Sequence, residues 1–407
     1  MNKKKIINDP VYGFINIPSE LVFDLISHPY FQRLRYIKQL GMTHLVYPGA
    51  LHTRFHHALG AMHLMSLAIE VLRSKGHLIS KEEEEAATIA ILLHDIGHGP
   101  FSHALEHTLV NGIKHEDISM LLMEKLNVEF GGRLTDAINI FKGDYPKKFL
   151  PQLVSGQLDL DRMDYLNRDS FFTGVSEGVI SFDRIIKMFN VLDDQLVIEE
   201  KGIYSIENFL IARRLMYWQV YLHKTVVAGE YLLVKILERA KELSGLGTVL
   251  FATPALQHFL KNEVKEEEFF SSEIHLAQFS KLDDQDIFAS VKVWADHEDR
   301  ILAQLCQMFI RRNLYKVEIS SEAPDPGRLA RIRENTADLM NLNAQEVCYF
   351  VFTDVIENRA YNAGSGNINI LMKNNTIIDI AKASDLSNLE SLDKTVTKHI
   401  LCYPRII

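Results

Sequence analysis

The segment from Ile91 to His103 constrains what this chain can fold into more than any other stretch. Apolar residues at helical spacing lead into the adjacent pair His94 and Asp95, and two glycines and a proline then break the helix. A histidine on an apolar face is usually a hydrogen-bonded core residue. A buried carboxylate beside it is costly unless it is paired or bound to a metal. The segment therefore predicts a buried helix whose end carries a polar cluster in need of further partners.

A second segment offers side chains of the same kind. A turn at Pro48 and Gly49 leads into a predicted helix on which Arg54 and His57, three residues apart, share one face. His57 is a candidate metal ligand, and Arg54 is a candidate clamp for a phosphate one turn away. The alternative, which this segment alone favours, is an ordinary pair of surface histidines.

A third segment, from Asp159 to Asp169, places acidic side chains at helical spacing. Asp161, Tyr165 and Asp169 step by four residues and so lie along one face of a helix. Asp161 is a candidate to complete a metal shell, the other two are candidates to meet a sugar or a base, and the adjacent Arg162 could meet phosphate. The alternative is an amphipathic helix whose acids are bridged internally by arginines.

Two weaker candidates come from helices further along the chain. His115, beside acidic residues at a predicted helix start, would serve as a proton shuttle, and an ordinary helix start fits the sequence equally well. A long helix predicted from about residue 206 to 243 carries Arg213, Tyr217, Tyr221 and Lys224 in steps of four, four and three. This stripe would suit a nucleotide, although tyrosines at such spacing are more often core residues.

The rest of the chain predicts a mainly α protein with a small α+β region at its end. Residues 1–312 are predicted as one helical domain and residues 313–407 as a small α+β domain, because short β-rich runs replace the helical pattern there. The further predicted elements are a hairpin over 6–17, a helix over 20–40 interrupted near Pro29, a helix over 284–312, strands over 315–319 and 347–355 flanking a helix near 328–339, and a hairpin over 367–380.

Charge and composition restrict the partners of the chain. A net charge of −9 argues against broad binding to nucleic acid or to an anionic membrane. The three cysteines are scattered, form no zinc or disulfide pattern, and suit a reducing cytoplasm. No run of about 18 uninterrupted apolar residues occurs, so the sequence predicts no membrane span.

The set His57, His94, Asp95 and Asp161 resembles, in order and spacing, the metal site of the HD-domain phosphohydrolases, with an HD core at about residues 50–170. The resemblance extends to the deoxynucleoside triphosphate triphosphohydrolases, both vertebrate and bacterial. The runs that carry this wider similarity are 30–41, 47–50, 54–57, 94–103 and 159–169.

That resemblance implies hydrolysis of a deoxynucleoside triphosphate to deoxynucleoside and tripolyphosphate, with one divalent metal ion (Mn, Fe, Mg or Zn). It also implies a homo-oligomer, either a dimer or a tetramer. The residue roles that it implies are metal ligation by His57, His94, Asp95 and Asp161; phosphate contact by Arg54, Arg162 and Arg213; a position near the α-phosphate for His98, His103 and His115, with His103 or His115 favoured for proton transfer; sugar contact by Gln39, Leu40, Tyr165 and Asp169; base contact by Tyr221; and a candidate allosteric anion site at Gln32, Arg33 and Arg35.

The sequence departs from the family pattern at three positions. His56 stands where the family has an acid before the metal-binding histidine, Tyr217 stands where it has a histidine, and Ser27 stands where an aspartate helps to read an activating guanine nucleotide. Two other functions remain open at this point: an HD-type phosphatase or phosphodiesterase acting on a nucleoside monophosphate or other phosphoester, and a non-catalytic nucleotide sensor. The presence of every presumed ligand counts against the sensor.

Overall fold

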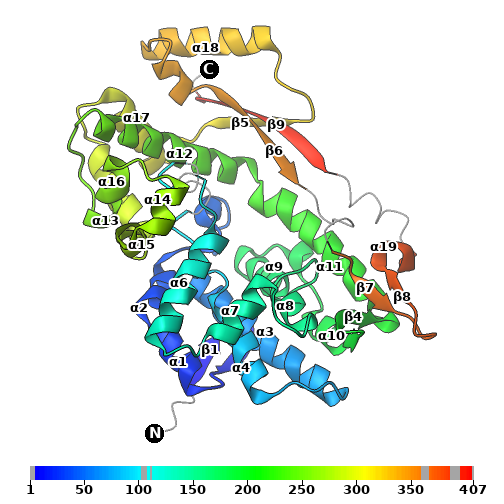
Figure 1. Ribbon diagram of the computed structural model, residues 1–407. Coiled ribbons are helices and arrows are strands. Elements are labelled where there is room, and N and C mark those ends of the chain that lie inside the picture. The colour runs from blue at the N-terminus through cyan, green and yellow to red at the C-terminus, as the bar shows by residue number, and fades with distance from the viewer. Residues whose placement is uncertain (1–4, 102–107, 111, 359–365, 386–394, 406–407) are drawn as a thin grey trace.

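The computed structural model describes residues 5–101, 108–110, 112–358, 366–385 and 395–405 (Figure 1). Helices dominate the described chain, which confirms the predicted mainly α fold. The helices are α1 (Glu20–Ser27), α2 (Pro29–Gln32), α3 (Arg54–Ser74), α4 (Lys81–Leu93), α6 (His115–Glu129), α7 (Thr135–Lys142), α8 (Phe149–Val154), α9 (Leu160–Thr173), α10 (Phe182–Lys187), α11 (Ile203–Met216), α12 (Lys224–Gly245), α13 (Pro254–Lys261), α14 (Glu266–Ser271), α15 (Glu273–Phe279), α16 (Asp284–Trp294), α17 (Arg300–Ile310), α18 (Pro326–Met340) and α19 (Ile380–Ala383).

Strands and tight helical turns complete the fold. The strands are β1 (Ile6–Asp9), β2 (Gly13–Asn16), β3 (Phe189–Leu192), β4 (Gln195–Glu199), β5 (Lys316–Ser320), β6 (Phe352–Asn358), β7 (Asn369–Leu371), β8 (Ile377–Asp379) and β9 (Val396–Tyr403). The short helical segments that bear on the site are the 3₁₀ turns η1 (Arg33–Tyr36) and η2 (Gly41–Leu45) and the π-helical η5 (Tyr217–Tyr221); the other 3₁₀ turns are η3 (Ser176–Gly178), η4 (Glu200–Gly202) and η6 (Glu346–Tyr349).

Helix α3 lies at the centre of the helical part and packs against both α4 and α9. It is the one described helix that is long and apolar enough to cross a membrane, but 67% of its apolar window is buried inside the structure, as in the core helix of a globular protein. Gly60 brings α9 close to α3: a Cβ on this residue would lie 2.0 Å from Asp164 Oδ1 and 2.1 Å from Arg168 Nη2. The sequence of α3 therefore fixes the position of the helix that carries Asp161.

Two sheets divide the C-terminal strands between them. Strands β5, β9 and β6 form an antiparallel sheet in that order, and α12 runs beside it (Figure 1). Strands β7 and β8 form the predicted hairpin, but β7 also pairs in parallel with β4, which extends the β3–β4 hairpin into a four-stranded sheet. The boundary near residue 312 stays a prediction.

Several predicted elements are correct in kind, and others are interrupted or shifted. The 6–17 hairpin forms as β1 and β2, and the helix near 328–339 forms as α18. The helix predicted over 284–312 is wrong between α16 and α17, because Asp299 accepts a hydrogen bond from the Leu302 backbone and starts a new helix. The strand predicted over 347–355 is also wrong at its start, since η6 occupies the chain up to Tyr349 and β6 begins at Phe352.

The long helix predicted over 206–243 is wrong in its middle. Helix α11 ends at Met216, η5 follows, and His223 caps the start of α12 by accepting from the Thr225 backbone. A π-turn widens the helix by one residue and rotates the residues after it relative to those before it, and such turns are frequent at functional sites. As a result Lys224 is exposed and does not line the pocket that Tyr217 and Tyr221 line.

Candidate metal centre and substrate pocket

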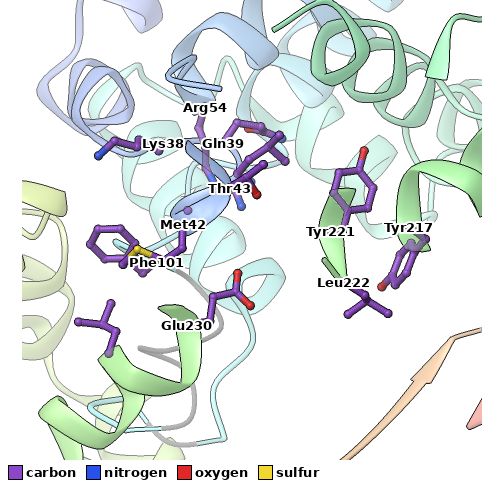
Figure 2. A pocket seen from close by; sticks show the side chains of 13 residues that line it. Lys38, Gln39, Met42, Thr43, Arg54, Phe101, Tyr217, Tyr221, Leu222 and Glu230 are labelled. Carbon is purple, nitrogen blue, oxygen red and sulfur yellow. The ribbon is translucent and has the colours of Figure 1, made fainter. Parts of the chain in front are cut away.

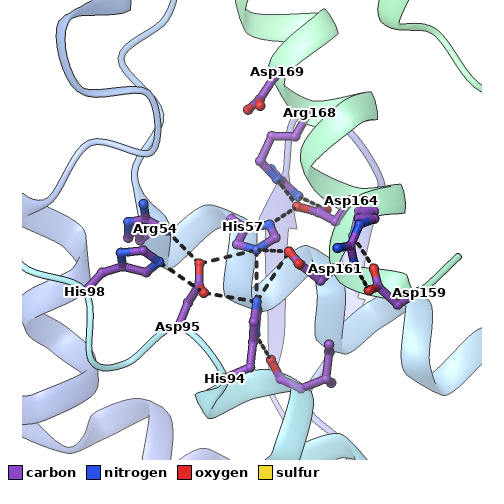
Figure 3. Close-up of polar contacts among 12 residues, drawn as sticks. Arg54, His57, His94, Asp95, His98, Asp159, Asp161, Asp164, Arg168 and Asp169 are labelled. Atoms are coloured by element: carbon purple, nitrogen blue, oxygen red, sulfur yellow. Dashed lines mark hydrogen bonds and ion pairs between the residues drawn. The ribbon is translucent and has the colours of Figure 1, made fainter. Parts of the chain in front are cut away.

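Three helices direct the four predicted metal ligands toward one point (Figure 3). His57 comes from the first turn of α3, His94 caps the end of α4, and Asp161 lies in the first turn of α9. The Nε2 atom of His57 lies 3.1 Å from Asp161 Oδ1 and 3.4 Å from His94 Nε2, and His94 Nε2 lies 3.4 Å from the same carboxylate oxygen. The structure thus brings together side chains that are 37 and 104 residues apart in the chain, counted from His57.

Asp95 completes the group from the residue after His94. Its Oδ1 lies 3.3 Å from His94 Nε2, and its Oδ2 lies 3.7 Å from His57 Nε2. Asp95 also accepts a hydrogen bond from Arg54 Nη1 at 2.7 Å. The four candidate ligands therefore share one small volume, with a guanidinium at its edge.

The other nitrogen of each imidazole is held by the protein. His94 Nδ1 lies 2.6 Å from the Ile91 carbonyl oxygen, which can only accept, so Nδ1 donates and Nε2 keeps its lone pair for the cluster. His57 Nδ1 lies 2.7 Å from Asp164 Oδ2, which fixes its ring in the same way. This is the arrangement by which proteins orient metal-binding histidines.

The donor set fits a divalent cation. Ligand atoms about 2.1 Å from one ion, at the angles of a tetrahedron or octahedron, are roughly 3.0–3.4 Å apart. The mutual separations of 3.1–3.4 Å among His57, His94 and Asp161 fall in that range. Two neutral imidazoles with two carboxylates suit Mn, Fe, Mg or Zn, and leave room for water or substrate.

Electrostatics favour a positive charge at this point. Burial disfavours the ionised form of Asp161, yet the imidazoles that face it hold the pKa of its carboxyl below the ordinary value. Burial likewise opposes the charged imidazolium of His57, but hydrogen bonds to Asp161 and Asp164 raise its pKa to about 10. The carboxylates thus stabilise cationic charge within their cluster.

His98 and His115 form a stacked pair next to the candidate metal ligands. Their ring centroids are 3.8 Å apart with an interplanar angle of 18°, and His98 Nε2 lies 3.3 Å from Asp95 Oδ1. Burial and the nearby Arg54 lower the pKa of His98 well below its ordinary value. His103, the third histidine of the predicted group, lies outside the described residues.

A pocket opens beside Arg54 and holds four further residues of the predicted substrate site (Figure 2). Gln39, Leu40 and Arg54 line this pocket, and Tyr217 and Tyr221 face Gln39 and Arg54 from η5. The buried Gln39 Oε1 and Arg54 Nε atoms have no hydrogen-bond partner within the described residues. Unsatisfied buried polar atoms are costly, so their convergence indicates a polar ligand.

The remaining predicted substrate residues extend from this pocket along α9. Tyr221 donates a 2.7 Å hydrogen bond to Asp169 Oδ2, and its ring contacts Tyr165 edge-on at 6.3 Å. Burial raises the pKa of Tyr165 to about 12, and the nearby cations Arg213 and Arg162 oppose that rise.

Arg162 is already engaged with protein groups. It forms an ion pair with Asp159 and donates to the Gly156 carbonyl oxygen at 2.5 Å, while its Nε has no partner within the described residues. The internal bridge between an acid and an arginine of α9, which the sequence offered as the alternative, is therefore present here. Only one edge of this guanidinium remains for a phosphate.

The predicted anion site does not come together as one surface. Arg33 is buried and donates to the carbonyl oxygens of Leu282 and Ile96, at 3.1 Å and 2.8 Å. Arg35 is exposed, stacks over an aromatic ring and donates to Gln32 Oε1 at 2.8 Å. Two of the three side chains thus share the surface, and the third points into the interior.

Two sequence features take on structural roles that the sequence did not predict. His56, which replaces the acid of the family pattern, caps α3: its Nδ1 accepts from the Thr53 backbone at 3.1 Å, as an acid would in a capping box. Gly97 packs directly on the start of α6, since a Cβ there would lie 2.3 Å from the His115 carbonyl oxygen.

A buried network behind His57 was not recognised from the sequence. Arg168 donates to both oxygens of Asp164 and, at 2.8 Å, to Asp9 Oδ2 from β1. Asp9 is 159 residues from Arg168, so no local spacing could have revealed the contact. His52, which lies 2.8 Å from Asp169 Oδ1, was missed for the same reason.

Comparison with known proteins agrees with this geometry. Residues 54–169 match the HD domain family and residues 180–247 match the HD associated region. The uncharacterized protein YwfO of Bacillus subtilis is 33% identical, with 100% of this chain and 93% of that protein covered. The crystal structure of a phosphohydrolase from Bacteroides thetaiotaomicron is 55% identical with a TM-score of 0.96, over 99% of this chain and 100% of that one. The chain belongs to the HD-domain phosphohydrolase family.

Named enzymes of this HD-domain family match the chain over a shorter region. The deoxynucleoside triphosphate triphosphohydrolase SAMHD1 of Homo sapiens is 31% identical, over 54% of this chain and 42% of that protein. The SAMHD1 homolog of Dictyostelium discoideum is 33% identical, over 58% of this chain and 50% of that protein. The chain thus spans half or less of these two relatives. It is a metal-binding phosphohydrolase.

Proposed function

We propose that this phosphohydrolase cleaves deoxynucleoside triphosphates to deoxynucleoside and tripolyphosphate. The observation that carries the proposal is the adjacency of the metal-ligand cluster to the pocket, through Arg54, which contacts Asp95 and also lines that pocket. The matched SAMHD1 enzymes, named as deoxynucleoside triphosphate triphosphohydrolases, support the substrate class. We further propose a soluble, cytoplasmic homo-oligomer that binds neither membrane nor nucleic acid broadly.

The chain's own residues divide the work of this reaction. His57, His94, Asp95 and Asp161 would hold one divalent ion (Mn, Fe, Mg or Zn), which supplies Lewis acidity toward a phosphoryl oxygen and activates water. Arg54 presents guanidinium N–H groups that Asp95 does not use, and these would bind phosphate oxygens. This balances the charge of the triphosphate.

Proton transfer and sugar binding fall to the flanking residues. The stacked His98 and His115 lie beside Asp95, and His115, which the family resemblance favours for proton transfer alongside His103, would deliver a proton to the leaving 5′-oxygen of the deoxynucleoside. Gln39, with an unsatisfied oxygen, and Asp169, which Tyr221 holds by a hydrogen bond, would contact the sugar. A 2′-hydroxyl against Leu40 in this wall would be unpaired, which favours deoxynucleotides.

The phosphate product tests the proposal. Full-length protein loaded with manganese is incubated with each dNTP, with the corresponding dNMP and with a phosphodiester, and products are identified by ³¹P NMR. Tripolyphosphate with free deoxynucleoside is expected. Orthophosphate from the dNMP would instead indicate a phosphatase, and saturable binding without turnover would indicate a sensor; either result contradicts the proposal.

A further inference from the structure

Glu230 lies in the substrate pocket, although the residues around it on α12 are largely apolar. Helix α12 packs closely on η2. A Cβ on Gly229 would lie only 2.8 Å from a methyl carbon of Leu45, so no larger residue fits there. This contact turns Glu230 toward Gly41, where a Cβ would lie 3.8 Å from Glu230 Oε1. Figure 2 shows the carboxylate between Phe101 and the two tyrosines of η5.

The carboxylate of Glu230 has no hydrogen bond or ion pair within the described residues, although cations line the same pocket. Lys38 Nζ is bound to Asp284 at 3.2 Å, and Arg54 Nη1 is bound to Asp95 at 2.7 Å. Burial alone raises the pKa of Glu230 to about 7. A carboxylate held in a ligand pocket without a donor is a site prepared for donors that a ligand brings.

The surroundings of Glu230 suit a flat ring rather than a phosphate. Phe101 and Met42 lie on one side of the pocket, Tyr217 and Tyr221 lie on the opposite side, and the apolar Leu233 also lines it. The negative charge of Glu230 would repel a phosphate from its end of the pocket, whereas Arg54 would attract a phosphate to the opposite end. In the orientation that follows, the triphosphate points to the metal cluster and the base points to Glu230.

The nucleobases differ in what they present to a carboxylate. Guanine offers two adjacent donors, N1–H and the 2-amino group, which pair with both carboxylate oxygens at once. Adenine and cytosine place an acceptor nitrogen beside their amino donor, and thymine flanks its single N–H with two carbonyl oxygens. Only guanine meets both oxygens of the ionised carboxylate without an acceptor facing an acceptor, so the selection belongs to the ionised form of Glu230.

We propose that Glu230 is a specificity-determining residue that selects a guanine base by pairing its two oxygens with N1–H and the 2-amino group. The inference rests on the proposed function, because it assumes that the pocket holds a deoxynucleoside triphosphate. A hydrogen bond to a charged group is lost when either partner is removed, so each donor contributes about tenfold or more to discrimination.

Deoxyinosine triphosphate, which lacks only the 2-amino group of dGTP, is the sharpest probe. We compare kcat/KM for dGTP and dITP in the metal-loaded wild type, in Glu230→Gln and in the control Glu238→Gln, whose side chain lies on the same helix and pairs with Lys235. The expected dGTP preference in the wild type and the control is about tenfold or more. It should fall toward one in Glu230→Gln, because an amide offers one acceptor in place of two. An equal rate with both substrates in the wild type, or an unchanged preference in Glu230→Gln, would overturn the inference.

Binding separates this inference from the proposed reaction. Calorimetry on metal-depleted full-length protein gives the ratio of dGTP to dITP affinities for the same three proteins. Tripolyphosphate release without any guanine preference would leave the proposed function standing and remove the role of Glu230. Tighter binding of dGTP that depends on Glu230, without tripolyphosphate release, would support the role of Glu230 and contradict the proposed reaction. Equal affinities of the wild type for dGTP and dITP likewise overturn the inference, and circular dichroism verifies that Glu230→Gln is folded.

Discussion

Asp164 Oδ2 lies 2.7 Å from His57 Nδ1, and this contact sets which nitrogen of the imidazole faces the candidate metal ligands. Both residues are fully buried, and Arg168 donates to both oxygens of Asp164 from one turn further along α9 (Figure 3). The orientation of His57 therefore depends on a charged network that includes none of the other three candidate ligands.

We predict that Asp164→Asn lowers metal affinity about 10- to 100-fold, because the amide loses the charge that orients His57 and increases its basicity. Titration of metal-depleted protein with manganese, followed by metal analysis, measures the change. Excess metal should restore much of the turnover. Asp144→Asn, in an exposed turn, is the matched control and should bind as the wild type does; equal affinity in Asp164→Asn would contradict the role.

We predict that Gly60→Ala lowers the free energy of unfolding by about 1–3 kcal/mol, because the added methyl group overlaps the buried Asp164 and Arg168 side chains. Urea denaturation measures the loss. Gly245→Ala, at the end of α12 with no atom within 4 Å of the new Cβ, should be neutral or stabilise by up to about 1 kcal/mol. Equal stabilities for the two variants would show that α3 and α9 are not in close contact at this point.

The sequence predicted most of the site because its signals are local. His94 and Asp95 are adjacent, Arg54 and His57 share a helix face, and a four-residue step selects Asp161; the structure brings these side chains together. Their role as metal ligands stays a prediction, which the metal content of Asp161→Ala tests. Glu230 also carries a local signal, an acid within a largely apolar helical run, although it was not predicted as a site residue.

What the sequence did not predict depends on long-range contacts. The pairing of Arg168 with Asp9 joins the ninth residue to α9, and the parallel pairing of β7 with β4 joins strands about 170 residues apart. Helical periodicity continues through Tyr217, so nothing in the pattern marked the π-turn that separates α11 from α12. Each of these features is decided by tertiary packing rather than by propensity.

We predict that Glu230→Gln stabilises the ligand-free protein at pH 8, by on the order of 1–3 kcal/mol, and much less at pH 5. Its pKa rises from 4.5 to about 7 on folding, so the unfolded chain ionises first and stability falls as pH rises from about 4.5 to 7. The neighbouring cations Lys38 and Arg54 are paired with Asp284 and Asp95 and do not offset this cost. Urea denaturation at both pH values measures it; a stability difference that is the same at pH 5 and pH 8 would contradict the prediction.

We predict that Tyr221→Phe lowers kcat/KM for a dNTP about tenfold, because Asp169 loses one of the two hydrogen bonds that position it. The effect should be smaller for a 2′,3′-dideoxynucleotide, which has no 3′-hydroxyl for Asp169 to bind. Tyr204→Phe, an exposed tyrosine near Asp385, is the control and should act as the wild type. An equal loss of kcat/KM with both substrates would contradict contact between Asp169 and the 3′-hydroxyl.

The metal content of Asp161→Ala tests the account most directly. Asp161 is the one candidate ligand that α9 contributes to the cluster, and its Oδ1 lies within 3.4 Å of both imidazole Nε2 atoms. Wild-type protein, loaded with manganese and then desalted, should retain one ion per chain by mass spectrometric metal analysis, whereas Asp161→Ala should retain none and show no phosphohydrolase activity. A folded Asp161→Ala protein that keeps a full equivalent of metal and normal turnover would contradict the account.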